Sequence, residues 1–213
     1  LTHYEGNSQW SDVSSTMYAD INRIKTIGEQ RLTEAKPRPH IQCENSHAMG
    51  NAMGNVREFF DLYEKYPALT GEFIWDWKDQ GIKMPVPNKP NEYYWAYGGD
   101  FGDSPNDGSF CTNGVVFADN SFSAKSYSTK KVYQPIDFFM KDDQKTFILK
   151  SKRAFKPTDD LDIYYSVFED GKEIKRNKLD VTLEGGATTE IILNVLPETP
   201  KPEAEYFIRF NAY

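Results

Sequence analysis

The chain has 213 residues, a length typical of one or two domains. Aromatic residues make up 15% of it, which favours a folded chain over a disordered one. The net charge of −7 argues against nucleic acid as a partner. No apolar run reaches the roughly 20 residues of a membrane helix, and no signal-peptide pattern precedes the first element.

The two cysteines, Cys43 and Cys111, are too few for a disulfide framework or a zinc quartet. We expect them to be two buried thiols that act as small apolar side chains. A bridge between them stays open at this stage.

Two helices are expected in the first part of the chain, up to about Thr129. Apolar residues recur at spacings of three to five from Val13 to Leu32, roughly as along one helical stripe. A cleaner stripe runs from Val56 to Tyr66 and stops before Pro67.

Two short apolar runs flank the second helix. His40–Glu44 precedes it and Gly71–Trp77 follows it, and both resemble buried strands. The order strand, helix, strand is typical of a parallel α/β sheet.

The second part of the chain, from about Lys130, has the regular short strands and tight turns of an antiparallel sandwich. Turns are expected at Asp170-Gly171 and Gly185-Gly186. The expected strands are Thr146–Lys150, Leu161–Phe168, Leu179–Leu183, Thr188–Leu196 and Glu205–Tyr213. A further strand is needed to close such a sandwich, so we expect this domain to be truncated at its C-terminus.

Glu44 is the main candidate for chemistry. It ends a strand-like run and precedes the glycine-rich stretch Gly50–Gly54. In βα folds the carboxyl ends of the strands face the active site, where a carboxylate serves as nucleophile or as acid/base. The alternative is a surface glutamate at the entrance to a loop.

His47 follows Glu44 by three residues, a spacing that also occurs in di-iron helical bundles. A di-iron site would need a helix around this motif and a second copy of it, and the sequence offers neither. A zinc cluster of His40, Glu44 and His47 is disfavoured, because a strand sends alternate side chains to opposite faces.

Two further segments carry possible binding groups. Trp75 and Trp77 would share one face of a strand, as core residues or with one ring exposed to stack on a sugar. The loop Tyr97–Asp107 is rich in Gly, Asp and Asn, and its oxygen atoms suit a hard cation.

Four segments in order carry a resemblance to a known family. They are Cys43–Asn51, Gly71–Gln80, Tyr97–Asp107 and Phe110–Asp119. Together they resemble the lacZ-type bacterial β-galactosidases of glycoside hydrolase family 2, strongly from Tyr4 to Asp119 and weakly onward to Tyr213.

The resemblance implies an α/β plus all-β fold. Residues 1–129 would be the C-terminal part of a (β/α)8 TIM barrel, and residues 130–213 an immunoglobulin-like antiparallel β-sandwich. The last three barrel strands would be Tyr4–Gly6, His40–Glu44 and Glu72–Trp77.

The resemblance also implies the chemistry. The family hydrolyses terminal β-D-galactose from β-galactosides such as lactose, with retention, through a covalent galactosyl-enzyme. By this likeness the site residues would be the nucleophile Glu44, the sugar-binding Tyr18, His47 and Trp75, and the sodium ligands Phe110 (carbonyl) and Asn113 (side chain).

Other parts of the family's machinery would lie outside this sequence. The acid/base glutamate and the magnesium ligands lie upstream in the family, so we expect these 213 residues alone to be inactive. The parent enzyme would be a homo-oligomer in the cytoplasm or periplasm of a bacterium, with no membrane or nucleic-acid partner.

The sequence departs from the family pattern in three places, at Asn45-Ser46, at Ser121–Lys125 and at Thr129–Lys131. Asn45-Ser46 stands where the family has Tyr-Ala, and the segment from Ser121 to Lys131 lacks the family's Pro-His-Pro and Glu-Val-Lys. These changes bear on the substrate more than on the reaction. The alternatives are a non-catalytic carbohydrate-binding module, or another family 2 activity such as β-glucuronidase or β-mannosidase; the segments Trp75–Trp77 and Gly99–Asp103 favour the galactosidase.

Overall fold

The computed structural model describes residues 10–213. The chain consists of two compact units, Leu1–Tyr133 and Gln134–Tyr213. No helix between residues 10 and 213 combines the length and apolar character needed to cross a bilayer.

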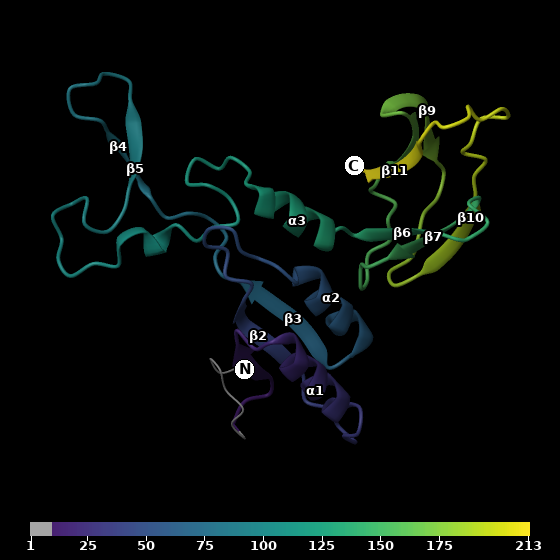
Figure 1. Cartoon of the computed structure of the whole chain (residues 1–213). Helices are drawn as coiled ribbons and strands as arrows, with labels where there is room; N and C mark the ends of the chain where they lie inside the picture. The colour runs from purple at the N-terminus through teal and green to yellow at the C-terminus, as the bar shows by residue number, and fades with distance from the viewer. Residues whose placement is uncertain (1–9) are drawn as a thin grey trace. The chain divides into compact units, whose positions relative to one another are not determined.

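The first unit alternates strands with helices (Figure 1). Strands β1, β2 and β3 form a parallel sheet in that order, and β4 and β5 form an antiparallel hairpin. Its elements are β1 (Ser14–Met17), α1 (Ile21–Arg31), β2 (His40–Asn45), α2 (Val56–Lys65), β3 (Leu69–Ile74), β4 (Ile82–Pro85), β5 (Tyr93–Ala96), a 3₁₀ helix (Gly108–Cys111) and α3 (Ala124–Val132).

The prediction of one helical stripe from Val13 to Leu32 is wrong in its first part. Ser14–Met17 is strand β1, which pairs in parallel with β2. The helix begins at Ile21 because Asp20 caps its N-terminus. The Asp20 side chain accepts hydrogen bonds from the backbone N–H groups of Asn22 and Arg23, which have no partner within the helix. The strand predicted at Tyr4–Gly6 lies outside the described residues.

The prediction of two tryptophans on one face of a strand is also wrong. Strand β3 ends at Ile74, and Trp75 and Trp77 follow it. Trp75 N–H still donates to the C=O of Asn45, the last residue of β2, at 2.9 Å. The backbone then leaves the sheet, and Asp76 N–H donates to Asn113 C=O at 3.0 Å.

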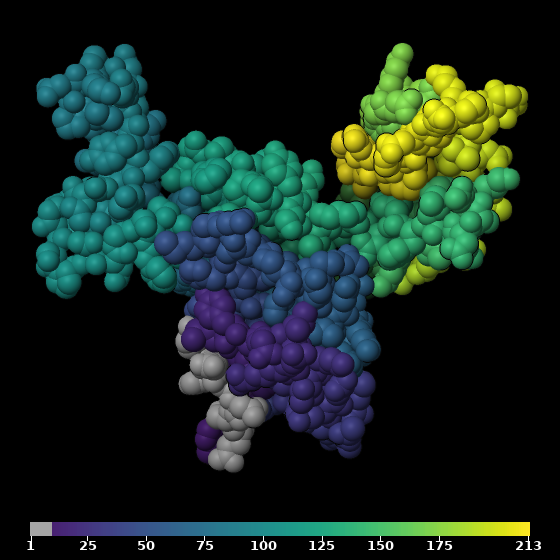
Figure 2. All heavy atoms as spheres, in the orientation of Figure 1, coloured from purple at the N-terminus to yellow at the C-terminus, as the bar shows by residue number. Residues whose placement is uncertain are grey.

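Helices α1 and α2 pack closely over the sheet. Ile24 of α1 and Phe59 of α2 belong to one buried cluster with Tyr66 and Leu69. In the space-filling view the purple atoms of α1 and the blue atoms of α2 lie against one another (Figure 2). Gly28 permits this approach, since a Cβ there would lie 2.6 Å from Tyr66 Cγ.

A second buried cluster lies beyond the carboxyl ends of the strands and includes Ala48, Val115 and Val132. Val132 of helix α3 belongs to this cluster, and the N-terminus of α3 is stabilised by a capping box whose N-cap residue is Ser123. Both cysteines are free and only half-buried, so the prediction of two buried thiols is wrong and no disulfide joins them.

The second unit contains two antiparallel sheets, with strand orders β10-β7-β6 and β11-β8-β9. The sheets share one apolar core that includes Phe147, Leu149 and Ile163, and Phe210 of β11 stacks on Phe138 of β6 with ring centroids 4.5 Å apart. This pairing fits the predicted sandwich, while its immunoglobulin-like detail stays a prediction. The strands are β6 (Ile136–Met140), β7 (Thr146–Ser151), β8 (Ile163–Glu169), β9 (Lys172–Leu179), β10 (Thr188–Ile192) and β11 (Tyr206–Ala212).

One strand of this unit was predicted in the wrong place. Leu179 ends β9, and the residues from there to Leu183 form no strand. Leu183 bonds to Thr158 instead: its C=O accepts from Thr158 N–H, and its N–H donates to Thr158 Oγ1, each at 2.9 Å. The strand that follows the predicted turn at Asp170-Gly171 is β9, whose exposed residues are mostly charged.

Candidate active site

The carboxyl ends of β1, β2 and β3 bring the candidate residues to one edge of the parallel sheet. Tyr18 follows β1, Glu44 is the second-last residue of β2, and Trp75 follows β3. Tyr18 N–H donates to Glu44 C=O at 2.8 Å, which fixes the exit of β1 to the end of β2. This is the edge at which βα folds assemble their active sites.

An irregularity in β2 decides which way Glu44 faces. Gln42 donates to the Tyr63 hydroxyl at 2.8 Å and Asn45 donates to the Glu72 carboxylate at 2.5 Å, so both side chains turn toward the same polar cluster. In a regular strand, side chains on the same face are an even number of residues apart, whereas Gln42 and Asn45 are three apart. The pairing register with β3 is accordingly broken between these two residues. In the pairing with β1, Thr16 partners Gln42 and Met17 partners Glu44, so Cys43 is the extra residue. Since neighbours along a strand point to opposite faces, we infer that Glu44 takes the face away from this cluster. Its side chain is half-buried.

Three aromatic rings lie next to the end of β2. Tyr18 meets His47 edge to face with ring centroids 6.1 Å apart, and His47 stacks on Phe110 at 5.8 Å. Tyr18 has a φ of 48°, a conformation that costs a large side chain of order 1 kcal/mol or more and is concentrated at functional sites. The Tyr18 side chain stays 40% exposed.

Trp75 is held through its backbone, which leaves part of its ring exposed. Its N–H donates to Asn45 C=O, and its C=O accepts from Ala48 N–H at 2.7 Å. These bonds tie the end of β3 to the loop that carries His47. The side chain is 39% exposed, as a stacking surface for a ligand requires.

Asn113 presents a buried oxygen that no group of residues 10–213 satisfies. The residue is 3% exposed, and its side-chain Oδ1 has no hydrogen-bond donor among them. An unpaired buried amide oxygen is costly unless a cation or water meets it. Asn113 therefore fits the sodium ligand that the family resemblance implies, and Phe110, three residues earlier, would add its carbonyl.

The acidic loop Tyr97–Asp107 uses its carboxylates internally. Asp100 accepts from Tyr97 N–H and Asp103 accepts from Gly99 N–H, each at 2.9 Å. No cluster of three or more His, Cys, Asp or Glu side chains within residues 10–213 is placed to hold a metal ion.

Glu72 is a residue that the sequence did not single out. Its carboxylate accepts hydrogen bonds from Asn45, from the Ser46 hydroxyl at 2.9 Å and from the Tyr63 hydroxyl at 2.9 Å. Burial raises the pKa of Tyr63, and the Glu72 charge adds to it; the same two causes raise the pKa of Tyr133 to about 12. The signal in the sequence was the departure at Asn45-Ser46, which supplies two of the donors.

A cavity of about 630 Å³ lies beside β3 but not at the candidate nucleophile. Its walls are mostly apolar and include Phe73, Trp77, Val116 and Tyr127. Neither Glu44 nor Tyr18, His47 or Trp75 lines it, so it is distinct from the carboxylate site.

Parallel strands that alternate with helices and end in a shared cluster of carboxylate and aromatic side chains define the first unit as a β/α domain. The chain belongs to glycoside hydrolase family 2. Residues 1–138 match the family described as glycosyl hydrolases family 2, TIM barrel domain, and residues 147–213 match the family described as β-galactosidase, domain 4.

Several curated relatives cover nearly the whole chain. The β-galactosidase of Priestia megaterium is 36% identical over 217 residues, covering 98% of this chain and 20% of the relative. That of Halalkalibacterium halodurans is 36% identical, with the same two coverages, and that of Vibrio vulnificus (strain YJ016) is 33% identical over 96% of this chain and 21% of the relative. The chain thus spans about a fifth of the length of these relatives.

Solved structures match less closely. The FMN-binding β-glucuronidase from Facaelibacterium prausnitzii L2-6 gives a TM-score of 0.37 at 10% identity, covering 97% of this chain and 34% of that one. Bacteroides uniformis β-glucuronidase 2 gives 0.34 at 10% identity, covering 97% and 26%. Scores this low carry no argument about substrate.

Proposed function

We propose that this chain carries the nucleophile side of the active site of a retaining β-galactosidase, with Glu44 as the nucleophile. The observation that supports this most is the position of Glu44 at the carboxyl end of β2, on the strand face opposite the Asn45–Glu72 cluster. Glu44 is half-buried, its backbone accepts from Tyr18 N–H, and the Tyr18 ring meets His47, so the residues that would hold a sugar gather at this strand end.

In the proposed reaction a Glu44 oxygen attacks the anomeric carbon of galactose. The bond from that carbon to the leaving oxygen breaks, and a second carboxyl group protonates the leaving oxygen. The same group then takes a proton from water, which attacks the anomeric carbon and releases Glu44. Retaining enzymes hold these two carboxyls about 5–5.5 Å apart.

The surroundings of Glu72 argue against it as the second carboxyl. Its oxygens accept from Asn45, Ser46 and Tyr63, on the face of the sheet that α2 covers. It therefore lies on the side away from Glu44 and acts as an acceptor, not as a proton donor. We propose that the acid/base comes from another segment of the enzyme, upstream of these residues, as do the magnesium ligands.

The neighbouring residues would bind and orient the sugar. The Tyr18 hydroxyl and the His47 ring would donate hydrogen bonds to it, and Trp75 would provide a surface for an apolar sugar face. Asn113 and Phe110 would hold a sodium ion, which supplies a fixed positive charge for a sugar hydroxyl when bound. Relatives named β-galactosidase at 36% identity support a galactoside as the substrate.

The first prediction concerns Glu44→Gln in the enzyme that contains this chain. The amide has nearly the same shape but cannot attack as an anion, so we expect kcat on an aryl β-galactoside to fall by about a thousandfold or more, ~4 kcal/mol. Glu58→Gln, an exposed carboxylate on α2, is the matched control and should keep full activity. A loss below about tenfold for Glu44→Gln, with the fold intact, would refute the nucleophile role.

The same assay separates the alternatives. Parallel measurements on aryl β-galactoside, β-glucuronide and β-mannoside identify the preferred sugar. Turnover of the glucuronide or mannoside alone would replace the galactosidase with another family 2 activity. Binding without turnover of any of the three would point to a carbohydrate-binding module.

A further inference from the structure

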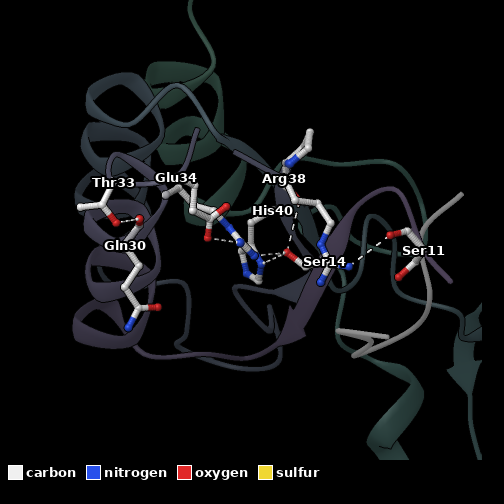
Figure 3. A network of polar contacts seen from close by, with 9 residues as sticks. Ser11, Ser14, Gln30, Thr33, Glu34, Arg38 and His40 are labelled. Carbon is white, nitrogen blue, oxygen red and sulfur yellow. Dashed lines mark hydrogen bonds and ion pairs between the residues drawn. The ribbon is translucent and has the colours of Figure 1, made fainter. Parts of the chain in front are cut away.

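A polar cavity of about 470 Å³ lies between β1 and α1. Figure 3 shows Ser14, Arg38 and His40 from its lining as sticks. Ser14 and His40, the first residues of β1 and β2, line it, so it lies at the opposite end of the strands from Glu44. Contacts between strands and helices in βα folds are ordinarily apolar. This one is lined by hydroxyl, amide, imidazole and guanidinium groups, and Ile27 is its apolar member.

Buried His40 forms the inner wall and has both ring nitrogens bonded. Its Nδ1 lies 2.9 Å from Ser14 Oγ and its Nε2 lies 3.1 Å from Thr16 Oγ1, while the residue is 4% exposed. Burial lowers the pKa of His40 to about 4, and the charges of Arg31, Arg23 and Arg38 add to the effect. The imidazole is thus neutral at pH 7 and does not supply an acceptor to these arginines.

The cavity collects positive charge, and Glu34 is a carboxylate that pairs with it. Arg31 donates through Nη1 to Glu34 at 2.6 Å and through Nη2 to Ser14 Oγ at 3.2 Å. Its Nε is buried and has no acceptor within the described part of the chain. Arg23 forms no ion pair among residues 10–213, and Arg38 brings a third guanidinium, with one bond to the Ser11 carbonyl at 3.2 Å.

We infer that this cavity binds a small oxyanion of the phosphate type, either inorganic phosphate or a phosphate ester. Three guanidinium groups converge on a space lined by no acidic side chain from residues 10–213, and arginine is the side chain best shaped for such anions. The buried Arg31 Nε–H is a donor with no acceptor among residues 10–213, and a bound oxyanion would satisfy it. The volume is many times the roughly 30 Å³ of a water molecule, which leaves room for a group attached to the phosphate.

The test is an NMR titration of the 213-residue chain with inorganic phosphate and, separately, with a hexose phosphate, at constant ionic strength set by chloride. The chain has three histidines, so the ring signals of His40 can be followed individually. A bound dianion offsets the arginine charges and stabilises protonated imidazole, so the pKa of His40 should rise toward its ordinary value. The signals of His47, at the other end of the strands, should not move.

Matched variants on α1 make the test specific. Arg23→Gln removes a lining charge and should weaken binding about tenfold, the usual worth of one charge-assisted hydrogen bond. Lys25→Gln removes an equal charge two residues away, from a side chain that pairs with Glu29 and does not line the cavity, and should leave affinity unchanged. Arg31→Lys keeps the charge but loses the Nε–H and should also weaken binding.

The outcomes separate cleanly. Tighter binding of the hexose phosphate identifies an ester as the ligand, and tighter binding of phosphate identifies the free ion. The inference is overturned if millimolar phosphate leaves the His40 signals unchanged, if chloride produces the same shift, or if Arg23→Gln and Lys25→Gln weaken binding equally. None of these measurements depends on catalytic activity, so the result is independent of the role of Glu44.

Discussion

At the scale of single residues, the irregularity in β2 matters most for the proposed chemistry. His40 and Gln42 both contact the helix side of the strand, His40 through the cavity beside α1 and Gln42 through Tyr63 of α2. Strict alternation from these two would send Glu44 to the same side. The break before Asn45 reverses this. The sequence predicted the strand and the residue, but not this reversal, because an extra residue in a strand leaves no mark in a six-residue pattern.

The departure at Asn45-Ser46 has a physical explanation in the structure. Both side chains donate to Glu72, which lies 27 and 26 residues further along the chain. Two polar side chains next to Glu44 would be costly if they were buried without partners, and the Glu72 carboxylate accepts from both. Sequence alone showed the departure and not its partner, since the two segments meet only through the pairing of β2 with β3.

A second prediction at this scale concerns His40. Its pKa is about 4 in the folded chain against 6.5 for the ordinary side chain, so between these pH values the unfolded chain binds more protons. Stability from this residue is therefore fully present above pH 6.5 and is lost as pH falls toward 4. The melting temperature of the native chain should drop more steeply over that window than that of His40→Gln, which lacks the titrating ring. Parallel pH profiles for the two proteins would contradict this.

At the scale of elements, local signals predicted some segments and tertiary pairing decided others. Helix α2 was predicted from its apolar stripe and from Pro67, and the structure confirms it as Val56–Lys65. Strand β1 was missed because Ser14, Ser15 and Thr16 are small and polar, yet all three are buried in a strand that pairs with β2. Strand β9 was missed because its residues are mostly charged and exposed. A sequence pattern detects apolar burial, and neither strand displays it.

The packing of α1 on α2 gives a prediction about Gly28. Alanine is favoured over glycine inside a helix by about 1 kcal/mol. At Gly28, however, a Cβ would lie 2.6 Å from Tyr66 Cγ, and relieving such overpacking costs about 1–3 kcal/mol. We expect Gly28→Ala to lower the free energy of unfolding, measured by urea denaturation. Gly54→Ala, whose Cβ would meet nothing within 4 Å, is the control and should not destabilise. A stabilised Gly28→Ala would contradict the close packing of the helices.

At the scale of the whole molecule, the sequence predicted the change from a β/α region to an antiparallel one, because the two periodicities differ. The structure has a parallel sheet of β1–β3 in the first unit and two antiparallel sheets in the second. The described residues supply three parallel strands of the predicted barrel, and the chain spans about a fifth of the length of its relatives.

A prediction about the activity of the 213 residues by themselves belongs to this scale. A retaining mechanism needs two carboxyl groups that face the sugar from opposite sides. Glu72 bonds to Asn45 at the end of β2, but it lies on the strand face opposite the one we assign to Glu44. We expect the 213 residues alone to show no turnover of an aryl β-galactoside, while the enzyme that contains them does. Robust turnover by the isolated chain would mean that both carboxyls lie within it.

The most direct measurement is covalent trapping of the nucleophile in that enzyme. The reagent is a galactosyl fluoride in which a second fluorine replaces the hydroxyl on the carbon next to the anomeric carbon. It forms the covalent glycosyl-enzyme quickly, but this ester is hydrolysed slowly and therefore accumulates. Peptide mapping by mass spectrometry should find the sugar on Glu44. A label on Glu72 or on any other residue, in an enzyme that turns over galactosides, would contradict the account.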